Sequence, residues 1–480
     1  MRERTENSYS KLFSNTIIFA IGSFSSKILV FLLLPLYTRT LTQGQLGTVD
    51  LIVQIANLLI PVVTVSVADA VIRFGLDNSQ KKSVIFSTSV TITLIGMLIF
   101  IFFIPLLSKI KYVESYGWLL YVYVFTASVK MVFSEFVRAR KLVKLYAFNG
   151  IVTTSSMIIL NLLFLVVFKI GMTGYLLAII LSDLLSIMFL TVIADLHRFF
   201  RLRWFSRETA RKMLRFSIPL IPTAMMWWVT NVSDRFLVAY SLGEAANGLY
   251  TISYKIPTII ATIYAMFNQA WNMSAITEHD SKNRNRFYSN VFDSNSSMVY
   301  IVAAGILLFI IPLTKLLVAP SFFISYYYAS YLVLATVFTC FSAFLSSVYT
   351  ATKKTMRSFV TCLIGALVNF ELNLLLIPKF GINGAAFATF VSYFLVFVIR
   401  LIDTRKLIRF RFLPGKIFIN TLILILMSLA VMNLIGTILW MTLIFGFMFI
   451  VLLNMGILIK AIRTVLPKKI LRLIPFIGKG

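Results

Sequence analysis

Four charged residues, Lys27, Asp183, Arg235 and Lys255, occur deep inside long apolar stretches of the sequence. If these stretches span a membrane, each charge near the bilayer centre costs about 2.5–3.5 kcal/mol on insertion scales, so the side chain usually faces a cavity, a partner or water. Two interpretations remain open. Either these residues act on a ligand, or they form static interhelical ion pairs, such as Lys27 with Asp183.

Polar side chains accompany the basic residues at helical spacing. Three predicted helix faces combine Ser23 with Lys27; Trp228 and Asn231 with Arg235; and Thr251, Thr258, Thr262, Gln269 and Asn272 with Lys255. A face that offers a lysine, hydroxyls and amides suits a ligand that carries phosphate and sugar hydroxyls. The side chains of Trp227, Trp228 and Trp271 can stack on sugar rings. The alternative is that these polar groups only hold membrane helices together.

The composition indicates which solvent surrounds the elements that carry these residues. Of the 480 residues, 59% are apolar and 13% are charged, whereas soluble domains contain about 25% charged residues. This balance predicts a protein surrounded by lipid. Cysteine is limited to Cys340 and Cys362 in apolar runs, and histidine to His197 and His279 in charged loops, so neither a disulfide nor a metal site is expected.

Apolar stretches of about 20 residues predict about fourteen membrane-spanning helices, and therefore an all-α polytopic membrane protein. The predicted spans cover residues 15–35, 48–72, 83–107, 115–136, 145–168, 172–194, 214–240, 246–275, 290–315, 325–350, 358–378, 383–402, 416–434 and 438–459. The polar first fifteen residues and the long apolar run after them argue against a cleavable signal peptide. Prolines inside the spans are expected to allow local bending, among them Pro61 and Pro257.

Most of the 45 Lys and Arg residues fall in loops on the side of the predicted spans that both termini share. Because cytoplasmic loops carry an excess of Lys and Arg, both termini are predicted to be cytoplasmic. The same asymmetry explains the net charge of +28 without a nucleic-acid partner, since the basic residues are spread over many short loops. Residues 197–217 and 460–480 are predicted to form basic helices at the lipid interface. Asp69 and Lys130 lie toward cytoplasmic span ends, where snorkelling can satisfy them.

A similar segment occurs in each half of the sequence. Asn161, Lys169, Gly171, Gly174, Ala178 and Ser182 match Asn373, Lys379, Gly381, Gly384, Ala388 and Ser392, with a gap of two residues after the asparagine. A weaker match pairs Leu41 and Gly47 with Leu242 and Gly248. Both matches relate spans six apart, so the halves share one orientation, as in parallel-repeat transporters. The predicted organisation is an N-terminal six-helix lobe (1–195), a basic amphipathic cytoplasmic linker (196–215), a C-terminal six-helix lobe (216–405), and an extra helix pair with a basic cytoplasmic tail (406–480).

Two segments are similar to a known family of exporters. Residues 19–51, FAIGSFSSKILVFLLLPLYTRTLTQGQLGTVDL, resemble the first helix pair of bacterial polysaccharide exporters. Residues 214–257 resemble their seventh and eighth helices, with the elements PLIP, SDRF and GLY…YKIP. The chain resembles, nearly end to end, the Wzx-type oligosaccharide-unit flippases of the multidrug/oligosaccharidyl-lipid/polysaccharide superfamily.

The resemblance implies a MATE-like fold and a flippase in the bacterial inner membrane. The implied substrate is an undecaprenyl-pyrophosphate-linked oligosaccharide, moved to the outer leaflet for surface polysaccharide or O-antigen assembly, with other polysaccharide-assembly membrane proteins as expected partners. It implies a cationic cavity, for which Lys27, Arg235 and Lys255 are the candidates. Coupling to a proton or sodium gradient is expected, with Asp183 and Glu371 as candidate carriers. No catalytic residue, metal or other cofactor is expected.

Two other functions remain open. A multidrug-cation exporter of the same superfamily would need net acid in its cavity, whereas the deepest charges here lean positive. A membrane enzyme of glycan assembly generally needs a sizeable extramembrane region, but the predicted outer loops are short and the sequence has no GxxxxGK[ST] or HExxH motif. We therefore expect a transporter, whose sugar unit and coupling ion the sequence does not identify.

Overall fold

The computed structural model describes residues 31, 33–76, 81–107, 109, 112–277, 284–352 and 354–465. Within these ranges most residues lie in helices and none lies in a strand. Eleven of the described helices are long and apolar enough to cross a membrane. The prediction of an all-α, multi-pass membrane protein is confirmed. The count of fourteen spans is not confirmed. The first predicted span, which carries Ser23 and Lys27, lies almost wholly outside the described residues, and the predicted spans 214–240 and 246–275 have no counterpart among the eleven helices.

The chain divides into two compact units. The first comprises the residues up to Ala239 together with Gly243–Gly248, and the second comprises Tyr240–Leu242 and the residues from Leu249 onward. Helices of the first unit are α2 (Leu34–Thr40), α3 (Gln43–Val63), α4 (Val67–Gly75), α5 (Lys82–Ile101), α6 (Ile104–Leu107), α7 (Gly117–Ala139), α8 (Val143–Asn161), α9 (Met172–Ile193), α10 (Arg207–Ser217) and most of α11 (Leu220–Leu242). After α12 (Glu244–Lys255), the second unit contains α13 (Thr258–Thr277), α14 (Arg284–Leu317), α15 (Ser325–Ala351), α16 (Thr355–Phe380), α17 (Ile382–Arg405), α18 (Pro414–Asn433) and α19 (Gly436–Val465).

The boundary between the compact units differs from the boundary between the predicted lobes. The lobes were expected to meet at the linker 196–215, whereas α10 and most of α11 belong to the first compact unit. These helices belong to the first unit because of local packing. Helix α10 packs against α4 and α5, and α11 forms a hydrogen bond and an ion pair with α3. The assignment of residues to repeat-related lobes stays a prediction.

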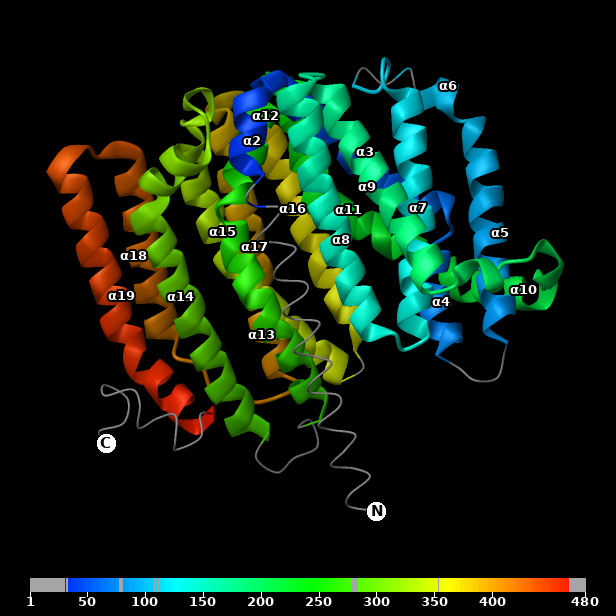
Figure 1. Cartoon of the computed structure of the whole chain (residues 1–480). Helices are drawn as coiled ribbons and strands as arrows, with labels where there is room; N and C mark the ends of the chain where they lie inside the picture. Colours follow the sequence, from blue (N-terminus) through cyan, green and yellow to red (C-terminus); the bar gives the residue numbers. More distant parts are fainter. Residues whose placement is uncertain are drawn as a thin grey trace. The chain divides into compact units, whose positions relative to one another are not determined.

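In the first unit, α7 packs against α3, α4, α5 and α9. One apolar cluster around Phe86 and Phe136 lies at the α10 end, and a second around Ile52 and Leu120 involves α3, α7 and α9. Figure 1 shows α10 lying across the ends of α4 and α5 instead of running parallel to them.

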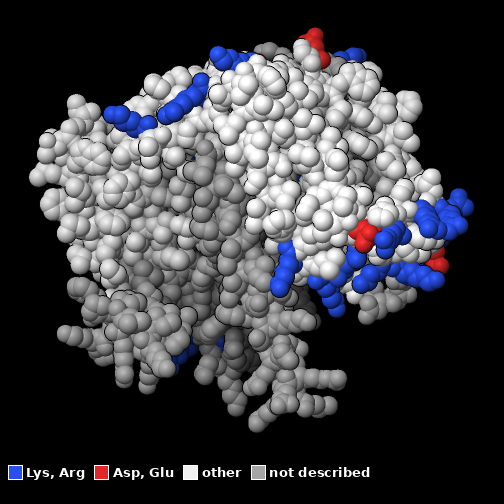
Figure 2. All heavy atoms as spheres, viewed as in Figure 1, with Lys and Arg blue, Asp and Glu red and all other residues white. Residues whose placement is uncertain are grey.

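Helix α10 has the two-faced pattern expected of an interfacial helix. The side chain of Ser206 accepts a hydrogen bond from the Thr209 amide and so caps the start of the helix. Ala210 and Met213 are buried, whereas the basic side chains are exposed. Figure 2 shows Lys and Arg side chains gathered around this helix. A basic face beside an apolar one is typical of helices at a membrane surface.

In the second unit, α15 is the central helix. It packs against α13, α14, α17 and α18, and its Phe338, Phe341 and Phe344 lie in the main apolar cluster. Other helices of this unit keep apolar side chains exposed, for example Leu375 of α16 and Phe445 of α19. That distribution fits helices whose outer faces meet lipid.

Two predicted spans are broken helices. The span 48–72 is interrupted at Thr64–Ser66, where Val65 and Ser66 have φ values of 53° and 49° and the Ser66 amide donates to the Pro61 carbonyl oxygen. The span 246–275 is interrupted before Pro257, which lacks an amide hydrogen and whose ring collides with the preceding turn of a continuous helix. The polar face predicted between Thr251 and Asn272 is therefore divided between α12 and α13.

The repeated segments adopt matching local structures in their respective units. Gly171 begins α9 with φ 64° and ψ −136°, and Gly381 begins α17 with φ 60° and ψ −140°. Asn161 and Asn373 are fully buried, and each donates its side-chain amide to the carbonyl oxygen four residues earlier. The sequence repeat therefore reflects a repeated helix–turn–helix structure.

Candidate functional site

A row of polar side chains runs along the membrane-spanning helix α3. Asp50, Gln54 and Asn57 are spaced by four and three residues, so they share one helix face. The amide of Gln54 lies 3.5 Å from Asp50 Oδ1, and the amide of Asn57 lies 3.5 Å from Gln54 Oε1. Asn57 is exposed and the other two are partly exposed. We call these three residues the α3 polar row.

The α3 polar row faces α11. Arg235 donates to Asp50 at 2.5 Å, and the Trp228 indole donates to the Gln54 carbonyl oxygen at 2.7 Å. The predicted face of Trp228, Asn231 and Arg235 thus contacts α3 through its two ends, and Asn231 between them is half-buried. The Arg235 and Asp50 side chains are only 17% and 11% exposed, so the ion pair is largely shielded from solvent.

Two glycines allow α3 and α12 to cross at very short distance. A Cβ at Gly47 would lie 1.9 Å from the Glu244 carbonyl oxygen, and one at Gly248 would lie 2.0 Å from the Gln43 carbonyl oxygen. Asn247 adds a hydrogen bond to the Gly47 carbonyl oxygen at 2.9 Å. These are the glycines that the weaker sequence match had aligned, and small residues are what permit such backbone approach between membrane helices. We call this contact the glycine crossing.

A second ion pair lies inside the first unit, between α7 and α9. Asp183 is 2% exposed and pairs with Lys130, whose side chain is 30% exposed. An interhelical ion pair was one of the two interpretations of Asp183. Among the described residues its partner is Lys130. The predicted partner, Lys27, lies outside the described residues. One helical turn beyond Asp183, Ser186 donates to Asn149 of α8 at 2.9 Å.

The predicted residues of α12, α13 and α16 have mixed environments. Lys255 and Thr258 are exposed on either side of the Pro257 break, and Thr262 is partly exposed. Glu371 is exposed on α16 and forms no ion pair with any described residue. The side chain of Gln269 lies outside the described part of the chain.

The three tryptophans expected to stack on sugars are not equivalent. Trp271 is 2% exposed, stacks on Phe344 at 4.3 Å and donates to Ser347, so it belongs to the core of the second unit. The prediction of a sugar-stacking role is therefore wrong for Trp271. Trp228 is partly exposed beside the α3 polar row, and the side chain of Trp227 is not described.

Sequence reasoning missed the α3 polar row, although its signal was present. Asp50 lies near the predicted start of the span 48–72 and was not among the deep charges identified from the sequence. The spacing of Asp50, Gln54 and Asn57 is the same kind of pattern that identified the Lys255 face. Among the described residues, no group of three or more His, Cys, Asp and Glu side chains is arranged to hold a metal.

Comparisons with known proteins agree with this architecture. The profile of a family described as polysaccharide biosynthesis protein matches residues 12–272, more than half of the chain. Among solved structures, the lipid II flippase MurJ in an inward closed conformation has a TM-score of 0.68 at 15% identity, covering 94% of this chain and 99% of that one. An outward-facing multidrug resistance MATE family transporter of the MOP superfamily has a TM-score of 0.59 at 17% identity, covering 82% of this chain and 94% of that one.

One curated relative adds little about activity. A segment of 69 residues is 41% identical to an uncharacterized membrane protein of Methanocaldococcus jannaschii, and the match spans only 14% of either chain. The structural likenesses lie below 20% identity and show the fold, which confirms the expected MATE-like architecture. The family match extends from residue 12 through most of α13 and includes the α3 polar row and both glycines of the crossing. The chain therefore belongs to the polysaccharide biosynthesis protein family.

Proposed function

We propose that this protein is a flippase that moves undecaprenyl-pyrophosphate-linked oligosaccharide units from the inner to the outer leaflet of a bacterial inner membrane. The observation that carries the proposal is the α3 polar row. Lipid offers no hydrogen bonds, so an exposed amide on a membrane-spanning helix needs water or a polar ligand beside it. Asn57 and Gln54 thus indicate that one face of α3 borders a hydrated path.

The family and the fold support the same class of function. The family is described by polysaccharide biosynthesis, and a solved structure of similar fold over 94% of this chain is a lipid II flippase. Both point to a lipid-linked glycan, whose charged and sugar-bearing headgroup cannot cross bare hydrocarbon at a useful rate. A polar path through the protein replaces the hydration of that headgroup while the polyprenyl tail stays in lipid.

Arg235 is the residue that we assign to the diphosphate. In the structure its charge is balanced by Asp50, so a diphosphate must compete with Asp50 for the guanidinium. Arginine binds phosphate and carboxylate through the same fork of N–H donors, which makes such an exchange chemically simple. The pair then holds Arg235 in place when no substrate is bound and releases it when the diphosphate arrives. Lys27 and Lys255 are proposed to add positive charge along the path.

Alternating access is proposed to involve the glycine crossing. With the N-terminus in the cytoplasm, the turns before α3 and α12 lie on the outer side of the membrane, and the crossing holds these two helix ends together. Opening toward the outer side requires α3 and α12 to separate there. Rocking of the predicted lobes would then break the glycine crossing and the Arg235–Asp50 pair together.

Ion coupling is assigned to Asp183 and Glu371 with different roles. Asp183 is paired with Lys130, so it exchanges a proton or sodium only when that pair opens. Glu371 is exposed without an ion-pair partner among the described residues, so it is accessible in the structure as it stands. A gradient-coupled cycle therefore uses Glu371 first.

The experiment is complementation of a bacterial strain that lacks its own exporter. We expect Lys27→Ala, Arg235→Ala and Lys255→Ala to reach the membrane and yet to leave lipid-linked units accumulated on the inner leaflet. Lys315→Ala, an exposed residue at the other end of α14 from the basic loops, is the control and should export normally. Normal export by all three variants would refute the binding role. Drug resistance without glycan export would instead identify a multidrug exporter, and glycan modification without export an enzyme.

A further inference from the structure

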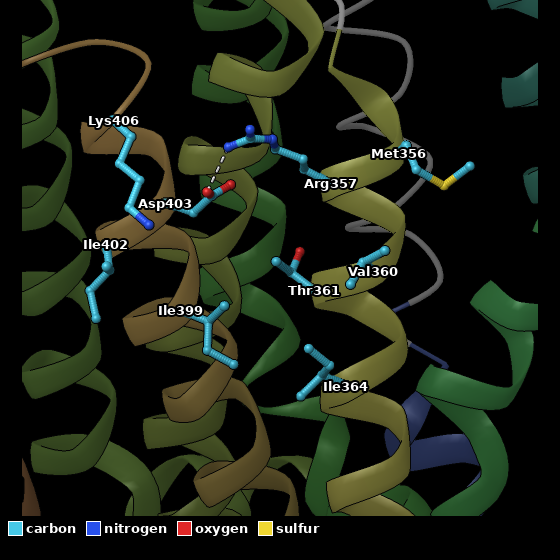
Figure 3. Close-up of a pocket in the computed structure, with 9 residues that line it drawn as sticks. All are labelled: Met356, Arg357, Val360, Thr361, Ile364, Ile399, Ile402, Asp403 and Lys406. Atoms are coloured by element: carbon cyan, nitrogen blue, oxygen red, sulfur yellow. Dashed lines mark hydrogen bonds and ion pairs between the residues drawn. The ribbon is translucent and has the colours of Figure 1, made fainter.

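A groove between α16 and α17 opens at the surface of the second unit (Figure 3). Its volume is about 450 Å³ and its lining is mostly apolar, with Val360 and Ile364 on α16 and Ile399 and Ile402 on α17. Ile402 is 59% exposed and Val360 is 44% exposed, so the groove is open to its surroundings. We call it the α16–α17 groove.

One end of the α16–α17 groove is charged. Figure 3 shows Arg357 and Asp403 facing each other across this end, with Ile364 and Ile399 deeper along the groove. Arg357 donates to one carboxylate oxygen of Asp403 at 2.7 Å, and the Tyr349 hydroxyl donates to the other at 3.0 Å. Lys406 lines the same end, is exposed, and has no carboxylate of the described residues within ion-pair distance.

A basic recess adjoins this charged end and shares Lys406 with it. The recess has a volume of about 410 Å³ and is lined by Arg405, Lys406, Arg409, Phe410 and Arg411. Four of its five lining residues are cationic and none is acidic. The recess therefore presents a concentrated positive charge directly beside an apolar groove.

A buried arginine lies behind the wall of the groove and increases this charge. Arg400 is 7% exposed and donates to the Thr361 hydroxyl at 2.9 Å, the Ser342 carbonyl oxygen at 2.8 Å and the Ser358 carbonyl oxygen at 3.2 Å. Thr361 is itself part of the groove lining. All three acceptors of Arg400 are neutral, so the guanidinium charge is not cancelled by these contacts.

From this juxtaposition we infer that the α16–α17 groove and its basic recess form a binding site for one anionic phospholipid of the surrounding membrane. The headgroup phosphate lies at Lys406 with the recess arginines around it, and one acyl chain lies along Ile364 and Ile399. Basic pockets at the cytoplasmic ends of membrane helices bind anionic headgroups in this way. A soluble phosphate would use only the cations and would not occupy the apolar groove beside them.

The site is distinct from the proposed transport path. Its residues come from the second unit, at the ends of α16 and α17 next to the basic loops. It does not involve Arg235 or the α3 polar row. A bound lipid would join α16 to α17 at this membrane face and would add to the contacts that Arg400 makes between them.

The test is native mass spectrometry of the purified full-length protein in detergent, titrated with phosphatidylglycerol or with zwitterionic phosphatidylcholine. We expect one phosphatidylglycerol to bind at least tenfold more tightly than phosphatidylcholine. Lys406→Glu reverses one charge, and at about 1 kcal/mol per cation the affinity for phosphatidylglycerol should fall roughly thirtyfold. Lys379→Glu, the same change at the opposite end of α16, is the control and should bind as wild type.

Two further measurements separate a lipid site from a simple anion site. Ile399→Trp fills the groove without changing charge and should also weaken phosphatidylglycerol binding at least tenfold; Ile399→Val, which leaves the groove open, should not. Inorganic phosphate at millimolar concentration should not displace the lipid. Equal binding of the two lipids, unchanged binding by Lys406→Glu, or displacement by inorganic phosphate would overturn the inference.

Discussion

Replacing Gly47 with alanine places a methyl group inside the glycine crossing. Its Cβ would lie 1.9 Å from the Glu244 carbonyl oxygen and 2.8 Å from the Gly248 amide nitrogen. Because a close carbon–oxygen contact is about 3.3 Å, α3 and α12 must separate by about 1.4 Å. Overpacking of this kind costs about 1–3 kcal/mol. The cost falls only on states in which the crossing is closed, so the balance between closed and open states shifts by about 5- to 150-fold.

The shift is measurable as a distance distribution. Spin labels at Arg39, at the end of α2 directly before α3, and at Ala245 of α12, both exposed, report the separation of this end of α3 from α12 by pulsed electron paramagnetic resonance. We expect Gly47→Ala to reduce the population at the wild-type distance and to add a longer one. Gly44→Ala is the matched control, because it lies on the same helix and its Cβ meets nothing within 4 Å. If both variants keep the wild-type distribution, the glycine crossing does not control the separation of α3 and α12 and the reasoning fails.

Three further predictions concern the charged side chains. The double variant Asp50→Arg with Arg235→Asp keeps an ion pair between α3 and α11 but moves the cation to α3. We expect this variant to export no glycan, as for Arg235→Ala, because the cation has moved. Normal export would show that the pair is only structural. Lys130→Met should lower the free energy of unfolding by about 2–3 kcal/mol, which is less than the 3–5 kcal/mol of fully buried pairs because Lys130 is 30% exposed. Adding Asp183→Asn should restore much of the lost stability. If thermal melts show no recovery in the double variant, the Lys130–Asp183 pair is not what stabilises this site. Arg400→Met removes hydrogen bonds to three neutral acceptors and should cost about 3 kcal/mol, whereas an unchanged melting temperature would contradict that role.

Much of the fold follows from the sequence because lipid imposes a strict requirement. Every backbone polar group inside the bilayer needs a partner within the helix, so length and apolar character are enough to locate most spans. The break before Pro257 follows from the chemistry of proline. The break at Val65 has no comparable signal, since a β-branched residue with positive φ is rare and nothing in the sequence favours it there.

The candidate site was less predictable because it depends on which helices are neighbours. Hydropathy indicated that Asp183 needed a partner, but Lys130 supplies it only because α7 packs against α9. Likewise, Arg235 was identified as a deep cation, but its pairing with Asp50 follows from the packing of α11 on α3. The sequence match of Gly47 with Gly248 was correct in position, yet only the structure shows that the two residues touch.

The function proposed above requires a hydrated, arginine-bearing path that carries an anionic lipid headgroup across the bilayer. The most direct test is transport by the purified protein in proteoliposomes that contain a fluorescent polyprenyl-diphosphate oligosaccharide, with translocation followed by quenching from outside. We predict rapid translocation by the wild-type protein, at least tenfold slower translocation by Arg235→Ala, and wild-type rates for Lys315→Ala. Wild-type translocation no faster than in protein-free vesicles would show that the protein does not carry this headgroup, and equal rates for Arg235→Ala and the wild type would show that Arg235 does not bind it.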